Sequence, residues 1–360
     1  MGDARLLIDT LRLAPPSDAR ALGAGWSGAD AGALVRLAEF EGAALWLQRR
    51  LKSLGIALDG EPGVRLGASA KRAAAHSLRT DAEATQTLAI LAAANVPAVL
   101  LKGAAMRRIS ARVPYADARV SSDVDLIVPA ASAQRAWDAL LANGYAPPGA
   151  AGPSDGHHLP ALAGSIGIGV EIHTTTVAGL PAAEAWQRAT HDGAAHLAVP
   201  SDTELLWHAV AHAVVTASDV GRSGVRLRYW LDPAALLAAG VAIDWDRIRA
   251  RLRSSECAFP DVARAWLRVA SDLAGVALPG EALGDTRASA IDFARLLSWR
   301  LRVLARPDQG SRWVEKLLEE GARGEASLPI EPAHDAALAP ARFRHAAASC
   351  AARLWWTMRR

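Results

Sequence analysis

The feature that most constrains this chain is a short apolar run that carries two carboxylates. Residues 122–128 read Ser-Asp-Val-Asp-Leu-Ile-Val. Alternation along a strand predicts that Asp123 and Asp125 lie on one face, about 7 Å apart along the backbone, while the flanking apolar residues face a core. Two carboxylates held so closely repel each other unless a cation lies between them. The run therefore predicts a metal site, with Mg²⁺ carrying nucleotide phosphates as the candidate occupant.

Two other segments supply partners for these carboxylates. Leu101-Lys102-Gly103 follows a short apolar strand at 98–101 and opens a short helix that ends at Ser110. A glycine at a helix start lets backbone N–H groups approach phosphate, and Lys102 adds a positive charge there. Val170-Glu171-Ile172-His173 places a third carboxylate on a separate strand, where Glu171 can complete a metal site and deprotonate an acceptor hydroxyl. His173 shares its strand face, either as a phosphate or acid contact or as a structural hydrogen bond.

Composition excludes several classes of protein. The net charge of +3 is small for 360 residues and is spread along the chain, so nucleic-acid binding has no strong electrostatic footprint. The chain has no uninterrupted apolar run long enough for a membrane span, and its first 25 residues show no secretory signal. Cys257 and Cys350 lie far apart, which argues against a disulfide framework or a cysteine-based zinc site. We expect a cytoplasmic protein.

The pattern of elements predicts an α+β fold, with a small mixed sheet flanked by helical regions. Residues 1–92 are expected to be an N-terminal helical region, 93–200 the sheet-containing core and 201–360 a C-terminal helical domain. We expect a long helix from about 68 to 94, and a helix over 132–141 that Asn143-Gly144 caps.

Further helices are expected in the carboxyl half. Asp232-Pro233 is typical of a helix cap followed by proline in the first turn, which predicts a helix over 234–239. The other expected helices cover 245–252, 258–274, 287–305 and 311–320.

These motifs together resemble the bacterial nucleotidyltransferase-like family of the DNA polymerase β superfamily. The segments that carry the resemblance are Leu101-Lys102-Gly103, Arg119, Ser122 to Val128, Gly144-Tyr145, Glu171-Ile172-His173, Leu205 to His208, His212, Arg226 to Asp232 and Asp244-Trp245. The resemblance covers roughly residues 85–255. It implies Mg²⁺ or Mn²⁺ on Asp123 and Asp125, with Glu171 as the third acid. It also implies that an NTP is bound around residues Lys102, Gly103, Ala104, Arg119 and His173.

The resemblance implies an enzyme that moves a nucleoside monophosphate from an NTP to a hydroxyl or phosphate on a small molecule, peptide or protein. The superfamily commonly has Ser after the turn glycine, and this chain has Ala104, so one hydroxyl contact to phosphate is missing. A catalytically inactive nucleotide-binding or partner-binding protein of the same fold is the alternative. His208 and His212 are one helical turn apart, which suits a metal, a polar role in the site or simple packing.

Overall fold

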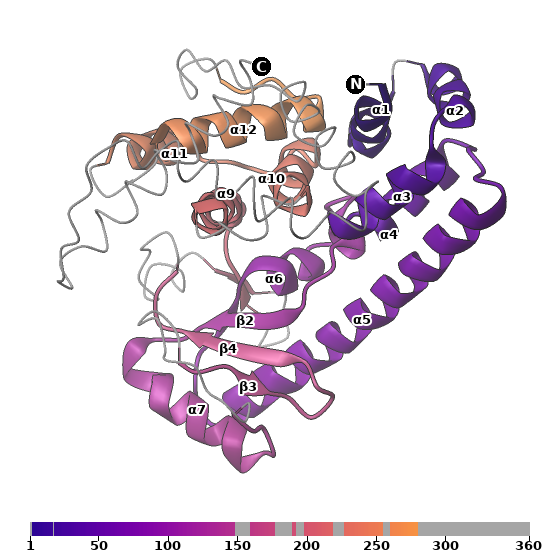
Figure 1. Cartoon of the computed structure of the whole chain (residues 1–360). Coiled ribbons are helices and arrows are strands. Elements are labelled where there is room, and N and C mark those ends of the chain that lie inside the picture. Colours follow the sequence, from indigo (N-terminus) through magenta and orange to yellow (C-terminus); the bar gives the residue numbers. More distant parts are fainter. Residues whose placement is uncertain are drawn as a thin grey trace, which may run out of the picture.

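The computed structural model describes residues 2–16, 18–147, 159–176, 189–191, 198–218, 227–254 and 260–279. The helices expected over 287–305 and 311–320 lie outside the described residues, as do Arg226, Cys257 and Cys350. The rest of the chain forms an α+β fold, as the sequence predicted, in which helices flank a small mixed sheet (Figure 1). None of the described helices is both long enough and apolar enough to cross a membrane.

The N-terminal part is helical. Its elements are α1 (Gly2–Leu11), α2 (Ala19–Gly28), α3 (Ala31–Phe40), α4 (Ala44–Ser53) and α5 (Gly60–Ala93). Asp18 and Asp30 start α2 and α3, because each carboxylate accepts a hydrogen bond from a backbone N–H in the first turn. The long helix α5 begins at Gly60, earlier than the sequence predicted, and ends just before Asn95, whose φ of 52° is left-handed.

Four strands form the central sheet in the order β1-β2-β4-β3. They are β1 (Val99–Leu100), β2 (Asp123–Ile127), β3 (Leu162–Ala163) and β4 (Gly169–His173). The neighbours β2 and β4 run parallel, whereas β1 and β3 are antiparallel to the strands they join. The parallel register sets Asp125 opposite Glu171. This pairing brings together two segments that are 46 positions apart in the chain.

Alternation along β2 separates the polar face of the sheet from the core. Val124 and Leu126 belong to the main hydrophobic cluster, as the sequence predicted, and so does Val128 just after the strand. Asp123 and Asp125 therefore point to the opposite face. Ile127 shares that face and packs in a second, smaller cluster with Val99 and Leu101. The carboxylates thus project from a strand whose position is fixed by packing on both sides.

Helices cover the sheet and connect it to the carboxyl half (Figure 1). The remaining elements are α6 (Lys102–Arg108), η1 (Ala116–Ala118), η2 (Ala130–Ser132), α7 (Ala133–Ala142), β5 (Thr190–His191), β6 (Ala198–Val199), α9 (Asp202–Ser218), α10 (Arg228–Ala238), α11 (Trp245–Arg253) and α12 (Pro260–Ala274). α7 ends before Gly144, whose φ of 87° confirms the predicted left-handed cap. In Figure 1, α6 lies between β2 and α9, and α5 runs down the side of the sheet to α7.

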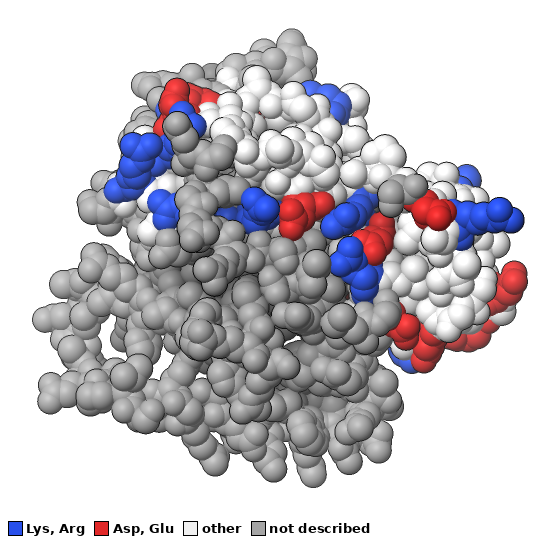
Figure 2. Space-filling view, turned by 90° about the horizontal axis from the view of Figure 1, so that it is seen from above, with Lys and Arg blue, Asp and Glu red and all other residues white. Residues whose placement is uncertain are grey.

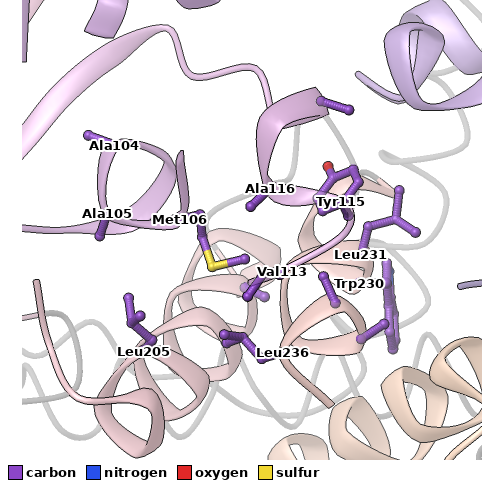
Figure 3. Packing of buried hydrophobic residues seen from close by; sticks show 14 of the residues in the cluster. Ala104, Ala105, Met106, Val113, Tyr115, Ala116, Leu205, Trp230, Leu231 and Leu236 are labelled. Carbon is purple, nitrogen blue, oxygen red and sulfur yellow. The ribbon is translucent and has the colours of Figure 1, made fainter. Parts of the chain in front are cut away.

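The expected cap at Asp232 is wrong. α10 begins at Arg228, so Asp232 and Pro233 both lie inside the helix. The reason is a tertiary contact: the Asp232 carboxylate accepts hydrogen bonds from the Arg119 guanidinium and is not available to cap a helix. Trp230, Leu231 and Leu236 of α10 are buried in the main hydrophobic cluster (Figure 3), and Trp230 stacks on Trp266 of α12. This packing offsets the backbone hydrogen bond that proline removes.

Candidate active site

Three side chains from the two parallel strands converge on one point. The ligand atoms of Asp125, Glu171 and His173 all lie within 4.8 Å of one another. His173 Nε2 is 3.0 Å from Asp125 Oδ1 and 3.4 Å from Glu171 Oε2. The side chain of Asp125 is 1% exposed, whereas that of Glu171 is 26% exposed, so the group is closed at Asp125 and reaches solvent at Glu171. The two carboxylates are ligands that suit Mg²⁺ or Mn²⁺, whereas an imidazole suits later transition metals such as Zn²⁺.

The ammonium of Lys102 also lies at this point. Lys102 Nζ is 2.5 Å from Asp125 Oδ1 and 4.0 Å from Glu171 Oε2. The residue has a φ of 47°, a left-handed conformation that costs a non-glycine residue about 1–3 kcal/mol. Its backbone follows β1 directly and starts α6, so the side chain is delivered beside β2. The Lys102 ammonium therefore lies beside Asp125 and Glu171, and its contact with phosphate stays a prediction.

The charges of the group stabilise one another. Burial alone would lower the pKa of Lys102, but the charge of Asp125 and the hydrogen bond to it outweigh burial and raise that pKa. Burial alone would raise the pKa of Asp125, yet Lys102 and His173 hold it below its ordinary value. Burial opposes protonation of His173, but hydrogen bonds to Asp125 and Glu171 raise its pKa. The Asp125 carboxylate is thus kept ionised next to positive charge.

Asp123 lies beside this group and not within it. Its half-buried carboxylate accepts a hydrogen bond from Ser121 Oγ at 3.4 Å. Burial, and then the charge of Asp125, raise the pKa of Asp123. The sequence predicted Asp123, Asp125 and Glu171 as the metal ligands, whereas the structure groups Asp125 and Glu171 with His173. The role of Asp123 as a metal ligand stays a prediction.

Gly103 is needed for a close approach of two chain segments. A Cβ atom at this position would meet Ser121 Oγ at 2.6 Å and Ser121 Cβ at 2.7 Å. Ser121 cannot easily move, because its carbonyl accepts hydrogen bonds from His76 and Thr80 of α5. The sequence explained this glycine by phosphate approach; the structure adds the contact with Ser121 as a second reason.

Replacing Gly103 by alanine should therefore destabilise the protein. Overpacking costs about 1–3 kcal/mol, and the better helix propensity of alanine returns up to about 1 kcal/mol. We expect a net loss of about 1–2 kcal/mol in the free energy of unfolding, measured by urea denaturation. Gly103→Ala/Ser121→Gly should recover most of the loss. An alanine variant as stable as the wild type would contradict the packing role.

Ala104 and Arg119, both expected near the nucleotide, are engaged within the protein. Ala104 is 3% exposed and belongs to the main hydrophobic cluster (Figure 3). A serine hydroxyl at this position would face apolar neighbours. Arg119 Nε lies 2.8 and 2.9 Å from the two carboxylate oxygens of Asp232, and both side chains are buried. Arg119 still lines the pocket described next, so a phosphate contact stays a prediction.

A pocket adjoins the carboxylate group. Its lining comes from α6, α9, α10 and the segment before β2, and consists of Lys102, Met106, Arg119, Leu205, His208, Ala209, His212, Tyr229 and Asp232. Lys102 belongs both to this pocket and to the carboxylate group. The His208 and His212 rings are nearly parallel, with centroids 6.1 Å apart, and His212 meets the Tyr229 ring edge-on. Sequence spacing placed the two histidines on one helix face but could not show that this face lines a pocket.

The chain matches the model of a protein family described as an uncharacterised nucleotidyltransferase, over residues 27–270. The match covers more than half of the 360-residue chain. The chain belongs to this nucleotidyltransferase family. The matched region includes α3 to α11, the whole sheet and every side chain of the candidate site. No curated protein matches the chain, and no solved structure matches it.

Proposed function

We propose that this family member transfers a nucleoside monophosphate from an NTP to a hydroxyl or phosphate group of a small molecule, peptide or protein, in an Mg²⁺- or Mn²⁺-dependent reaction. The observation that carries the proposal is the convergence of Asp125, Glu171 and His173 beside the Lys102 ammonium. Membership of the family supports nucleotidyl transfer as the reaction class. The donor set supports the need for a divalent cation.

The chemistry requires charge neutralisation and positioning above all. The acceptor oxygen attacks the α-phosphorus, the bond between the α-phosphorus and the bridging oxygen breaks, and pyrophosphate leaves. A divalent cation held by Asp125 and Glu171, with Asp123 nearby, would neutralise phosphate charge. Lys102 keeps its positive charge and contacts the phosphates, and the backbone at Gly103 lies beside it. We assign Glu171, the more exposed carboxylate, to accept the proton of an acceptor hydroxyl.

A protein that binds nucleotides without turnover is the second candidate. The observation that favours it is the ion pair of Lys102 with Asp125, which neutralises the buried carboxylate without a metal. The burial of Ala104 in the core agrees with it, since no hydroxyl is offered at that position.

A labelling experiment separates the two candidates. The full chain is incubated with each NTP, labelled at the α- or the γ-phosphate, with Mg²⁺, with Mn²⁺ or with EDTA. Water and the protein itself serve as acceptors. We expect metal-dependent release of pyrophosphate, with the α-label in NMP or on the protein. Binding of NTP with no release of pyrophosphate would favour the second candidate, and release of orthophosphate would contradict both.

The described part of one face favours an acceptor other than nucleic acid. On the described part of the face seen in Figure 2, basic and acidic side chains are interspersed. A nucleic-acid-binding surface would carry a stripe of basic side chains. The small net charge of +3 also argues against such a surface. We further propose a cytoplasmic location, which the scarcity of cysteines supports: the chain has two.

A further inference from the structure

The pocket next to the carboxylate group contains a buried histidine with unused hydrogen-bonding capacity. His208 is 6% exposed. Neither of its ring nitrogens, Nδ1 or Nε2, has a hydrogen-bond partner within the part of the chain that the structure describes. A buried polar atom without a partner costs about 1–3 kcal/mol. Two such atoms on one pocket-lining side chain indicate that a ligand supplies the missing partners.

The imidazole of His208 is uncharged. Burial, and then the positive charge of Lys102, lower the pKa of His208 to about 3. Burial likewise lowers the pKa of its neighbour His212. A neutral imidazole offers one N–H donor and one nitrogen acceptor. His208 can therefore recognise a group that presents a donor and an acceptor.

The rest of the lining suits a flat and largely apolar group. Met106 and Leu205 are apolar, and Tyr229 and His212 contribute ring surfaces. The charges in the lining are already engaged, because Arg119 pairs with Asp232 and Lys102 pairs with Asp125.

The position of the pocket beside the carboxylate group indicates which ring it would hold. Lys102 lines the pocket and lies 2.5 Å from Asp125, so a molecule whose phosphates reach the carboxylate group can place its other end in the pocket. A zinc ion is not favoured, because the described residues contain one group of three metal-ligating side chains and His208 is not in it. We propose that the pocket holds the nucleobase of the NTP, with His208 hydrogen-bonded to the edge of the base. This inference rests on the proposed function.

Binding measurements on the full chain test the proposal. Affinities are measured by calorimetry with Mg²⁺ for the four α,β-methylene NTPs, in which the bond to be broken is replaced, and for tripolyphosphate, which has no base. We expect one nucleotide to bind about tenfold more tightly than tripolyphosphate and than the least favoured nucleotide. His208→Phe should abolish this preference and leave tripolyphosphate binding unchanged. His208→Gln keeps a donor and an acceptor and should retain part of the preference.

Controls separate base recognition from a structural role. Trp207 is the neighbouring residue on α9 and lies near Arg251, outside the pocket, so Trp207→Phe should keep the wild-type preference. Without ligand, His208→Phe should melt at or above the wild-type temperature, because two unpaired buried nitrogens are removed.

Each other outcome has a defined meaning. Equal binding of all nucleotides and tripolyphosphate, or an unchanged preference in His208→Phe, would overturn the base site; a water molecule or the acceptor would then be the occupant. The proposed function would survive that result, since phosphate binding would be intact. If the wild type does not bind tripolyphosphate in the presence of Mg²⁺, both the base site and the proposed function would be refuted.

Discussion

Replacing Asp125 by asparagine should lower nucleotidyl transfer by about 10³-fold or more. The carboxylate is 1% exposed, and its Oδ1 lies near both Lys102 Nζ and His173 Nε2. Asparagine keeps the size of the side chain but removes the charge that a divalent cation needs. Metal-held charge is worth several kcal/mol in the transition state, and each 1.36 kcal/mol is a factor of ten in rate. The measurement is pyrophosphate release from the preferred NTP, together with Mn²⁺ binding followed by electron paramagnetic resonance.

Two further variants make this result specific. Asp138 is an exposed aspartate on α7 that contacts Gln134, so Asp138→Asn should retain wild-type activity and Mn²⁺ binding. Asp125→Asn alone leaves the Lys102 ammonium without its nearest partner, and this change can affect folding as well as chemistry. Lys102→Met/Asp125→Asn removes both charges and should fold like the wild type while remaining inactive. Activity within tenfold of the wild type in Asp125→Asn would exclude Asp125 from the metal site.

The sequence predicted most of this site because local rules determine most of it. Alternation in residues 122–128 predicted that the two aspartates share one face of the strand. It also predicted that Val124 and Leu126 face the core, as the structure confirms. The same rule placed Glu171 and His173 on one face of β4. The membership of His173 in the metal-ligating group depends on the parallel register of β2 and β4, which no local pattern specifies.

Contacts distant in sequence explain what the sequence did not predict. Asp232-Pro233 has the local signature of a helix start, but its carboxylate is paired with Arg119, 113 positions earlier. Ala104 follows the turn glycine, where a phosphate contact was expected, yet its methyl group is buried in the main hydrophobic cluster. The left-handed backbone at Lys102 has no sequence signal, because lysine rarely adopts that conformation. The predicted domain limits at 92/93 and 200/201 stay predictions.

Breaking the buried pair of Arg119 and Asp232 should have the largest effect on stability. Both side chains are less than a tenth exposed, and the pair links the segment before β2 to α10. Removing one member of such a pair leaves an uncompensated buried charge and costs about 3–5 kcal/mol. Small domains have a total stability of about 5–15 kcal/mol. We therefore expect Arg119→Met to unfold at a much lower urea concentration than the wild type, followed by tryptophan fluorescence.

A compensated double variant shows whether Arg119 also binds the nucleotide. Replacing both members by apolar residues of similar size is neutral or stabilising in other buried pairs, so Arg119→Met/Asp232→Leu should recover wild-type stability within about 1 kcal/mol. If Arg119 only joins β2 to α10, this variant binds tripolyphosphate as the wild type does. If the guanidinium also contacts phosphate, as the sequence predicted, affinity stays about tenfold lower although stability is restored. Unimpaired stability in Arg119→Met alone would show that solvent, and not Asp232, satisfies this guanidinium.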